Sequence, residues 1–481
     1  MYYNKIHSAT NLRLFNKGRI SAALIIVVFL VGIIIPVVLA FMRPVIPGFI
    51  EFFPPEIQIS ETPRGIGLSP VILRVIFRDH ESGLSSLGIS VISDYGRTDL
   101  LTKNAKGVNS TEESVLLDSG KLGLKNGQVT IEITAKDSSV WGRQTVKTLQ
   151  LQVDRNKPAI DKISSRYSAR IGGTHFIIFQ ASDEALALTG VRVGHSTFPA
   201  FPAKNFDADF EVPDLYATFF TMPTTLGGTE EQAKLFAEDS VGNIVTIPLP
   251  IPNQYQNIQP RQEIRISSES QNGLLEHFGF VEQPQDPFKV LYSELRPKAD
   301  IEIGEKLRTN ARFEKFWEGA FQFPLADSNS YSGQYSYGDS VSVIVNDQQV
   351  ANFTATGTLI GMSQATERIS SSQEGIVAYA GSIPGYGRTV AIDHGLGIAT
   401  VYGELGALMV KNGDQVKSGQ GVGAPGLPRG ANFKRVFIQT RIHGVPTNPQ
   451  DLTDNSWRTD VFAGALREAK EKLRIPVRRG L

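Results

Sequence analysis

The segment GYGRTVAIDHGLGIATVYGELGALMVKNGDQVKSGQGVGAPG, residues 385–426, decides the fold of the C-terminal region. Apolar residues alternate with other types at Val390 and Ile392, and again from Ile398. This period of two predicts two β-strands, which we expect to join at Asp393-His394-Gly395. The glycines that follow set tight turns, so we expect a β domain of short strands, either a barrel or a sandwich.

Motifs in and around this segment resemble those of the lysostaphin/LytM-type zinc endopeptidases, which cut peptidoglycan cross-bridges. Members of that family carry Tyr-Gly, Asp-His-Gly-x-Gly, Thr-x-Tyr-x-His-Leu and a glycine-rich turn region. The resemblance covers about residues 315–452 and implies a LytM-type (duplicated hybrid motif) β domain at residues 331–452. It rests on Tyr386-Gly387, Asp393 to Gly397, Thr400 to Tyr402, Val410 to Gly423 and Gly444 to Pro449.

The zinc site that this resemblance implies lacks its ligands here. A catalytic zinc needs three protein ligands from His, Asp or Glu, and an open position for water. The family takes them from an early His-x-x-x-Asp motif and a late His-x-His motif. An ungapped alignment back from Ile369 places Thr356 and Ile360 at the early motif. A shift of one residue places Ala355 and Leu359 there instead.

The remaining family positions are replaced as well. Glu404 stands where the family has the His of its Tyr-x-His-Leu strand, and Arg435 and Phe437 stand where it has the late pair. No histidine occurs between His277 and His394, and His394 itself fits a structural His-Gly turn. We therefore expect no catalytic residue, no metal ligand and no cofactor, although the family implies zinc. The degenerate groove positions are Thr356, Ile360, His394, Glu404, Arg435 and Phe437.

The region before this domain is built from two similar β modules. Short alternating apolar runs separated by Gly, Asp, Asn and Ser predict antiparallel sandwiches. The motif Ala135-Lys136-Asp137-Ser138 recurs as Ala237-Glu238-Asp239-Ser240, which gives a period of about one hundred residues. One immunoglobulin-like β-sandwich has that length, so we expect such modules at residues 50–155 and 156–255. Their acidic turns are interpreted as turn chemistry and not as calcium sites.

The N-terminal end carries an apolar stretch without a charged residue at positions 20–42. About 20 helical residues cross a bilayer, and the four basic residues that precede the stretch favour a cytoplasmic N-terminus. The sequence predicts a basic cytoplasmic segment at 1–19, a transmembrane signal anchor at 20–42 and a single-pass inner-membrane protein whose bulk lies in the periplasm. A cleaved signal peptide is the alternative, since Val38-Leu39-Ala40 loosely resembles a cleavage site.

Length and composition set further limits. The 481 residues suffice for about three domains. Lys and Arg number 48, as do Asp and Glu, so net charge indicates no nucleic-acid partner. The absence of cysteine excludes disulfides, thiolate metal sites and thiol nucleophiles. Residues 256–330 are expected to form a linking α+β segment. Residues 453–481 are expected to form an amphipathic helix and a basic tail. A solvated, frayed terminus is the favoured interpretation, and docking on the β domain through Val461, Leu466 and Ala469 is the alternative.

Three functions remain open. The first is a membrane-anchored, catalytically inactive LytM-type protein that acts in the cell envelope by binding peptidoglycan or by regulating a wall hydrolase. The second is an active peptidoglycan metalloendopeptidase with a site rearranged around Glu404, Asp393 and His394, although adjacent strand residues point to opposite faces. The third is a structural or adaptor component of an envelope assembly, since Val410 to Gly423 also resembles the turn of lipoyl-like barrels. The missing ligands favour the first.

Overall fold

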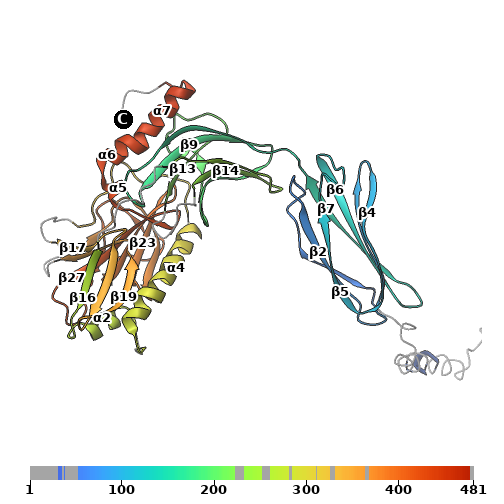
Figure 1. The fold of residues 1–481 in the computed structure, drawn as a ribbon, viewed down its shortest axis with the longest axis horizontal. Helices are drawn as coiled ribbons and strands as arrows, with labels where there is room; N and C mark the ends of the chain where they lie inside the picture. The colour runs from blue at the N-terminus through green and yellow to red at the C-terminus, as the bar shows by residue number, and fades with distance from the viewer. Residues whose placement is uncertain are drawn as a thin grey trace, which may run out of the picture. The chain divides into compact units, whose positions relative to one another are not determined.

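The computed structural model describes residues 31–34, 37, 53–222, 232–251, 261–280, 284–309, 311–325, 331–362 and 368–476. The described residues are mostly β-strand, and the chain divides into two compact units, Met1–Arg155 and Asn156–Leu481 (Figure 1). The expected segment 1–19 lies outside the described residues, as does the expected anchor 20–42 except for the helical positions 31–34 and 37. In the part of the chain that is described, no helix has the length and hydropathy that a membrane crossing requires.

The first unit holds a two-sheet sandwich with its own apolar core. Buried side chains such as Leu73, Phe77 and Ile131 come from both sheets, as alternation along each strand dictates. The strand order is that of an immunoglobulin-like sandwich. One sheet is β1 (Glu56–Glu61), β2 (Val71–Arg78) and β5 (Ser110–Leu117), and the other is β4 (Gly96–Val108), β3 (Leu84–Ser93), β6 (Gly127–Asp137) and β7 (Gln144–Val153).

The second unit begins with another sandwich of two four-stranded sheets. Its acidic turn is satisfied by the chain itself, because Asp239 Oδ1 accepts hydrogen bonds from the backbone amides of Val241, Gly242 and Asn243 at 2.7–2.9 Å. The sheets are β11 (Ser196–Pro199), β10 (Leu186–Val193), β14 (Lys234–Asp239), β15 (Ile244–Pro248), and β12 (Phe201–Pro202), β13 (Leu215–Thr221), β9 (Thr174–Ser182), β8 (Ala159–Arg166).

The C-terminal domain is built on one large antiparallel sheet. Asp393 and His394 lie inside β23, and the turn to β24 is made by Leu396 and Gly397, whose φ angles of 52° and 80° fit a type I′ hairpin. The expected turn is therefore displaced by a few residues. In order the strands are β17 (Tyr331–Tyr335), β20 (Thr358–Met362), β27 (Lys434–Ile442), β24 (Ile398–Leu408), β23 (Gly387–Gly395), β22 (Gly375–Ile383) and β25 (Gln415–Val416), with β21 (Ile369–Ser370), β26 (Gly421–Pro425) and β28 (Val445–Thr447) beside them.

The described parts of residues 256–330, which are 261–280, 284–309 and 311–325, hold a strand and helices, and their apolar side chains pack in the cores of this domain. The strand β16 (Arg261–Ile266) pairs in parallel with β18 (Ser340–Val345), which also pairs with β19 (Gln348–Thr354). Apolar side chains of the helices that follow are buried against the large sheet, which explains why this stretch is ordered there. These helices are α2 (Gln271–His277), α3 (Pro287–Val290), the π-helical η2 (Leu291–Leu295) and α4 (Arg296–Thr309).

The C-terminal helices pack on the second sandwich and not on the β domain alone, which also corrects the expectation. Val461, Leu466 and Ala469 are buried in one cluster with residues of β9 and β13 (Figure 1). Lys470 Nζ lies 2.7 Å from Asp207 and 2.8 Å from Asp209. The basic end of the tail lies outside the described residues. The helices are α5 (Gln450–Thr453), α6 (Asn455–Trp457), the π-helical η4 (Arg458–Phe462) and α7 (Ala463–Leu473).

Candidate functional site

One face of the large sheet, here called the groove face, carries the positions that the family motifs single out. Leu359 of β20 lies opposite Phe437 of β27, and both are buried in one apolar cluster with Val401. Helix α4 runs along this face (Figure 1), and its Ala299, Ile303 and Leu307 belong to the same cluster. The chain's own helix therefore covers the face on which an active family member would bind its substrate.

The early ligand positions face this helix with unsuitable side chains. The Thr356 hydroxyl donates a hydrogen bond to Asp300 Oδ2 of α4 at 3.1 Å. Ile360 packs in the apolar core on the opposite side of the sheet, whereas its neighbour Leu359 faces the groove. Of the two alignments that the sequence allows, only the shifted one, Ala355 and Leu359, buries both of its side chains in the apolar cluster of the groove face.

Glu404 is fully buried between two arginines on the groove face. Arg435 Nε lies 2.5 Å from Glu404 Oε2, and Arg296 of α4 pairs with the other carboxylate oxygen. Arg296 Nη1 also donates to the Tyr335 hydroxyl at 2.7 Å. The position that holds a histidine in the family is thus the centre of an ion cluster that ties α4 to the sheet.

A break in strand alternation directs Glu404 toward this cluster. Tyr402 and Leu405 are three residues apart, yet both pack in the core on the other side of the sheet. Strict alternation would put them on opposite faces. Glu404 lies between them with a φ of 58°, a conformation uncommon for a residue with a Cβ, so its side chain emerges on the groove face.

The ion cluster carries one positive charge in excess. Burial by itself raises the pKa of the Glu404 carboxyl, but the attraction of Arg435 and Arg296 outweighs it, and the net shift is downward. Burial lowers and Glu404 raises the pKa of Arg435, with a net upward shift. Aromatic faces offset part of the excess charge, since the Arg296 guanidinium lies 5.2 Å from the Phe437 ring and 5.0 Å from the Tyr292 ring. All three groups therefore stay charged at neutral pH.

A second polar cluster holds α4 one turn further along. Asp300 Oδ1 accepts hydrogen bonds from the Tyr386 hydroxyl at 2.5 Å and from Gln439 Nε2 at 3.0 Å. Arg441 pairs with the same carboxylate. Asp300 also accepts a hydrogen bond from Thr356, where the unshifted alignment places the first histidine of the family. The hydrogen-bond donors around Thr356 are therefore already paired with Asp300. Burial raises the pKa of the Tyr386 hydroxyl, so it remains a donor.

The residues present do not fit a catalytic zinc. The groove-face positions Thr356, Leu359 and Phe437 offer no imidazole and no carboxylate. Glu404 is the one acid nearby in the family motif, and both of its oxygens face guanidinium groups.

His394 and Asp393 do not combine into a rearranged site. His394 Nδ1 lies 2.7 Å from the Glu374 carbonyl, which can only accept, so Nδ1 carries the proton and Nε2 accepts from the Thr400 hydroxyl at 2.9 Å. Burial lowers the pKa of His394 to about 4, so the ring is neutral. Asp393 points to the other face of β23, where its Oδ1 accepts from the Gly395 amide at 2.9 Å.

Arg296 of the ion cluster and Asp300 of the second polar cluster were not predicted from the sequence. They are four residues apart in α4, so they lie on one face of the helix together with Ala299 and Ile303. Ionisable residues that share a face with apolar ones are the signal that could have identified them. The sequence could not show that this face meets Glu404, which lies more than one hundred residues later.

Comparison with known proteins places a family match on this domain. The family described as Peptidase family M23 matches residues 353–449. The murein hydrolase activator EnvC of Escherichia coli is 33% identical over 94 residues, which are 20% of this chain and 22% of EnvC. Stage II sporulation protein Q of Bacillus subtilis is 31% identical over 107 residues, 22% of this chain and 38% of that protein. The chain thus spans well under half the length of these relatives.

A protein that is named as an enzyme is also similar to this chain. The DD-carboxypeptidase/endopeptidase Mpg of Neisseria meningitidis is 28% identical over 116 residues, 24% of this chain and 27% of Mpg. Among solved structures, the catalytic domain of lysostaphin from Staphylococcus simulans is 21% identical, with 25% of this chain and 90% of that domain covered and a TM-score of 0.21. That score is too low to add to the assignment.

Proposed function

We propose that this chain, whose residues 353–449 match Peptidase family M23, is a catalytically inactive relative of that family and regulates a wall hydrolase in the cell envelope. The proposal includes the membrane anchor at residues 20–42 and a periplasmic location for the bulk of the chain. Peptidoglycan binding without regulation, and a structural or adaptor role, are the other functions that the tests below distinguish.

The filled groove carries this proposal. Hydrolysis requires a substrate bound beside a metal-activated water, and both need open space on the groove face. In this chain α4 covers that face, and Arg296 pairs with Glu404 and Asp300 pairs with Arg441 across it. Because separating buried ion pairs from their partners is costly, the helix is a permanent part of the fold and not a loosely held cover.

The names of the relatives support regulation over catalysis. EnvC is named as an activator of murein hydrolases, which is a role that needs no metal of its own. Mpg shows that enzymes occur among similar sequences, so the fold alone does not decide between the two roles. The groove face of this chain, which α4 covers, favours regulation.

The test measures zinc content and wall hydrolysis together. Purified full-length chain is incubated with excess zinc, desalted and analysed for metal, then added to dye-labelled sacculi with and without a wall hydrolase of the same cell. We expect near-zero zinc, no dye release by the chain alone, and faster release by the hydrolase when the chain is present. One zinc per chain together with release by the chain alone would overturn the proposal.

The same experiment separates the remaining roles. Sedimentation of the chain with sacculi, without any effect on hydrolases, would indicate peptidoglycan binding alone. Absence of both effects would indicate an adaptor role. Restoring ligands provides a further check: the variant with Ala355→His, Leu359→Asp and Arg435→His should remain inactive, because Arg296 and α4 still occupy the groove face. Activity in that variant would show that the groove is open.

A further inference from the structure

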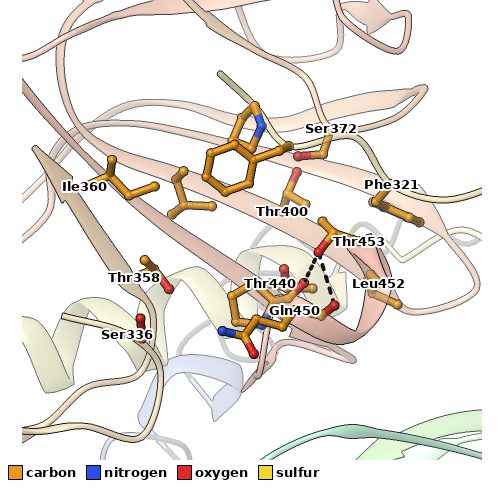
Figure 2. Close-up of a pocket in the computed structure, with 14 residues that line it drawn as sticks. Phe321, Ser336, Thr358, Ile360, Ser372, Thr400, Thr440, Gln450, Leu452 and Thr453 are labelled. Atoms are coloured by element: carbon orange, nitrogen blue, oxygen red, sulfur yellow. Dashed lines mark hydrogen bonds between the residues drawn. The ribbon is translucent and has the colours of Figure 1, made fainter. Parts of the chain in front are cut away.

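A small pocket lies on the side of the large sheet that faces away from α4. Figure 2 shows Thr358, Ile360, Thr400 and Ser372 among its lining residues. Its volume is about 120 Å³, which is below the ~300–1,000 Å³ of typical small-molecule sites. The hydroxyls of Thr400 and Ser372 already contact the Tyr402 hydroxyl at 3.1 and 2.8 Å. This pocket is too small for an ordinary ligand, and the surface that indicates a further contact lies in the first unit.

One end of the first sandwich carries a group of exposed apolar side chains. The start of β1 and the end of β2 lie together at this end, since Glu56 pairs with Arg78. The loop 79–83 leads from there into β3, and both β4 and β6 end beside Leu84, the first residue of β3. The exposed side chains at this end, here called the apolar tip, are Phe53, Val108, Val140 and Trp141.

The loop that presents Val140 and Trp141 is fixed by a buried carboxylate. Asp137 Oδ1 accepts hydrogen bonds from the backbone amides of Ser139 at 3.1 Å and Arg143 at 2.9 Å. The backbone amide of Ser138 donates to the Gly83 carbonyl at 2.7 Å, which joins this loop to the loop 79–83. The apolar side chains between these fixed positions are therefore held outward, although water solvates them poorly.

The chain enters the first sandwich at this same end. Residues 43–52 connect Phe53 to the proposed membrane anchor at residues 20–42. At ~3.3–3.6 Å per residue this connection spans at most about 36 Å, so the tip lies within that distance of the bilayer that holds the anchor. The chain leaves the sandwich at the opposite end, where Val153 ends β7 opposite Gly127.

We propose that the apolar tip inserts into the interfacial layer of the phospholipid bilayer in which the chain is anchored. The inference rests on the anchor that is part of the proposed function. A Trp side chain favours that layer, because its ring is apolar while its indole N–H stays hydrated. Lys106 and Lys136 lie near the tip, as do Glu56 and Glu81, so the local charges balance. The contact therefore depends on the apolar side chains and not on anionic lipid.

Tryptophan fluorescence tests this contact on the full-length chain. Among the three tryptophans, Trp141 is 71% exposed, whereas Trp317 and Trp457 of the second unit are only 4% and 6% exposed. The chain is reconstituted into vesicles of phosphatidylethanolamine and phosphatidylcholine, with the phosphatidylcholine either unmodified or brominated near the headgroup. Bromine quenches an indole only on contact. We expect lower emission in the brominated vesicles, and no such loss in Trp141→Phe.

A tryptophan at the other end of the same sandwich is the matched control. Tyr95 lies in the turn between β3 and β4 and is 70% exposed. The double variant Trp141→Phe, Tyr95→Trp therefore carries an equally exposed indole on the same tether, and we expect no quenching in it. Equal quenching of this variant and the wild type would overturn the proposal, because nearness to the bilayer alone would then explain the signal.

Flotation of the vesicles reports on the anchor separately. If the wild-type chain floats with both kinds of vesicle but has the same emission in each, the contact is overturned while the anchor stands. If the chain does not float with the vesicles, the anchor is overturned and the contact with it. Flotation together with quenching of Trp141 alone would support the contact.

Discussion

At the scale of single residues, Glu404 is the centre of a buried ion cluster. The carboxylate balances two buried guanidinium groups, and it reaches them through a left-handed backbone conformation within β24. Removal of the charge leaves Arg296 and Arg435 in the interior without a counter-ion. Such loss of one partner costs more than the pair itself contributes to stability.

Glu404→Gln should therefore lower the free energy of unfolding by about 3–5 kcal/mol, measured by urea denaturation. The matched control is Glu263→Gln, which removes the same charge from an exposed pair with Arg265 and should change stability by less than about 1 kcal/mol. A loss at Glu404 no larger than that at Glu263 would show that the cluster does not hold α4.

The same group sets an acid limit on stability. The pKa of Glu404 is lower in the folded chain than its ordinary value of 4.5, so its contribution is complete above that pH and is lost as the pH falls through the folded pKa. The difference in stability between wild type and Glu404→Gln should thus shrink on acidification below about pH 4.5. A difference that stays constant to pH 3 would contradict this assignment.

Asp393 predicts the opposite dependence. Burial raises the pKa of Asp393 to about 6, against an ordinary value of 3.8. The ionised carboxylate is therefore disfavoured in the folded chain, and it lowers the free energy of unfolding as the pH rises through this range. Asp393→Asn should stabilise the protein on the order of 2 kcal/mol at pH 8, with the gain vanishing near pH 4. Asp347→Asn, at a side chain that is 95% exposed, is the control and should show no such trend.

At the scale of elements, α4 is held by its apolar stripe as well as by its charges. Ile303 is fully buried against the groove face, whereas Ile301, two residues earlier in the same helix, is 61% exposed. The two positions therefore separate packing from helix propensity. The stripe repeats at the spacing of helical turns, which keeps Ala299, Ile303 and Leu307 on one side.

Ile303→Ala should cost about 2–5 kcal/mol of unfolding free energy, because the cavity that it leaves lies between the helix and the sheet. Ile301→Ala makes the same change in solvent and should cost less than about 0.5 kcal/mol. Equal effects at the two positions, measured by urea denaturation, would mean that α4 does not pack on the groove face.

At the scale of the whole molecule, the second sandwich and the C-terminal domain share one core. Phe176 and Phe219 of the sandwich are buried in the same cluster as Ile398 and Ile442 of the large sheet and Trp457 of α6. The first sandwich has a separate core around Leu73. We expect two cooperative transitions on heating, one for each unit.

Phe219→Ala should lower the free energy of unfolding of the second unit by about 3–5 kcal/mol and leave the transition of the first unit unchanged. The C-terminal domain should melt together with the destabilised sandwich. Leu73→Ala should shift only the first unit. Differential scanning calorimetry measures both. Melting of the C-terminal domain at an unchanged temperature in Phe219→Ala would show that its core is independent of the sandwich.

Local chemistry was sufficient for much of the fold. Period-two runs, turn residues and the repeat around Asp137 and Asp239 predicted the β-sandwiches, because alternation and turn propensity act within a few residues. The glycine-rich motif likewise predicted the family of the C-terminal domain, and the residues at Thr356 and Phe437 already predicted the loss of a zinc site. These conclusions need no knowledge of what packs on the strands.

Tertiary structure alone decided what became of the groove. The sequence predicted an α+β segment at residues 256–330, but it could not show that helix α4 within it is buried against the large sheet. The pairing of Arg296 with Glu404 joins positions 108 residues apart, and a break in strand alternation directs the carboxylate. Contacts at such separation depend on the packed geometry and leave no periodic trace. The sequence therefore predicted that the zinc ligands are missing, and only the tertiary structure decided that α4 packs on the groove face.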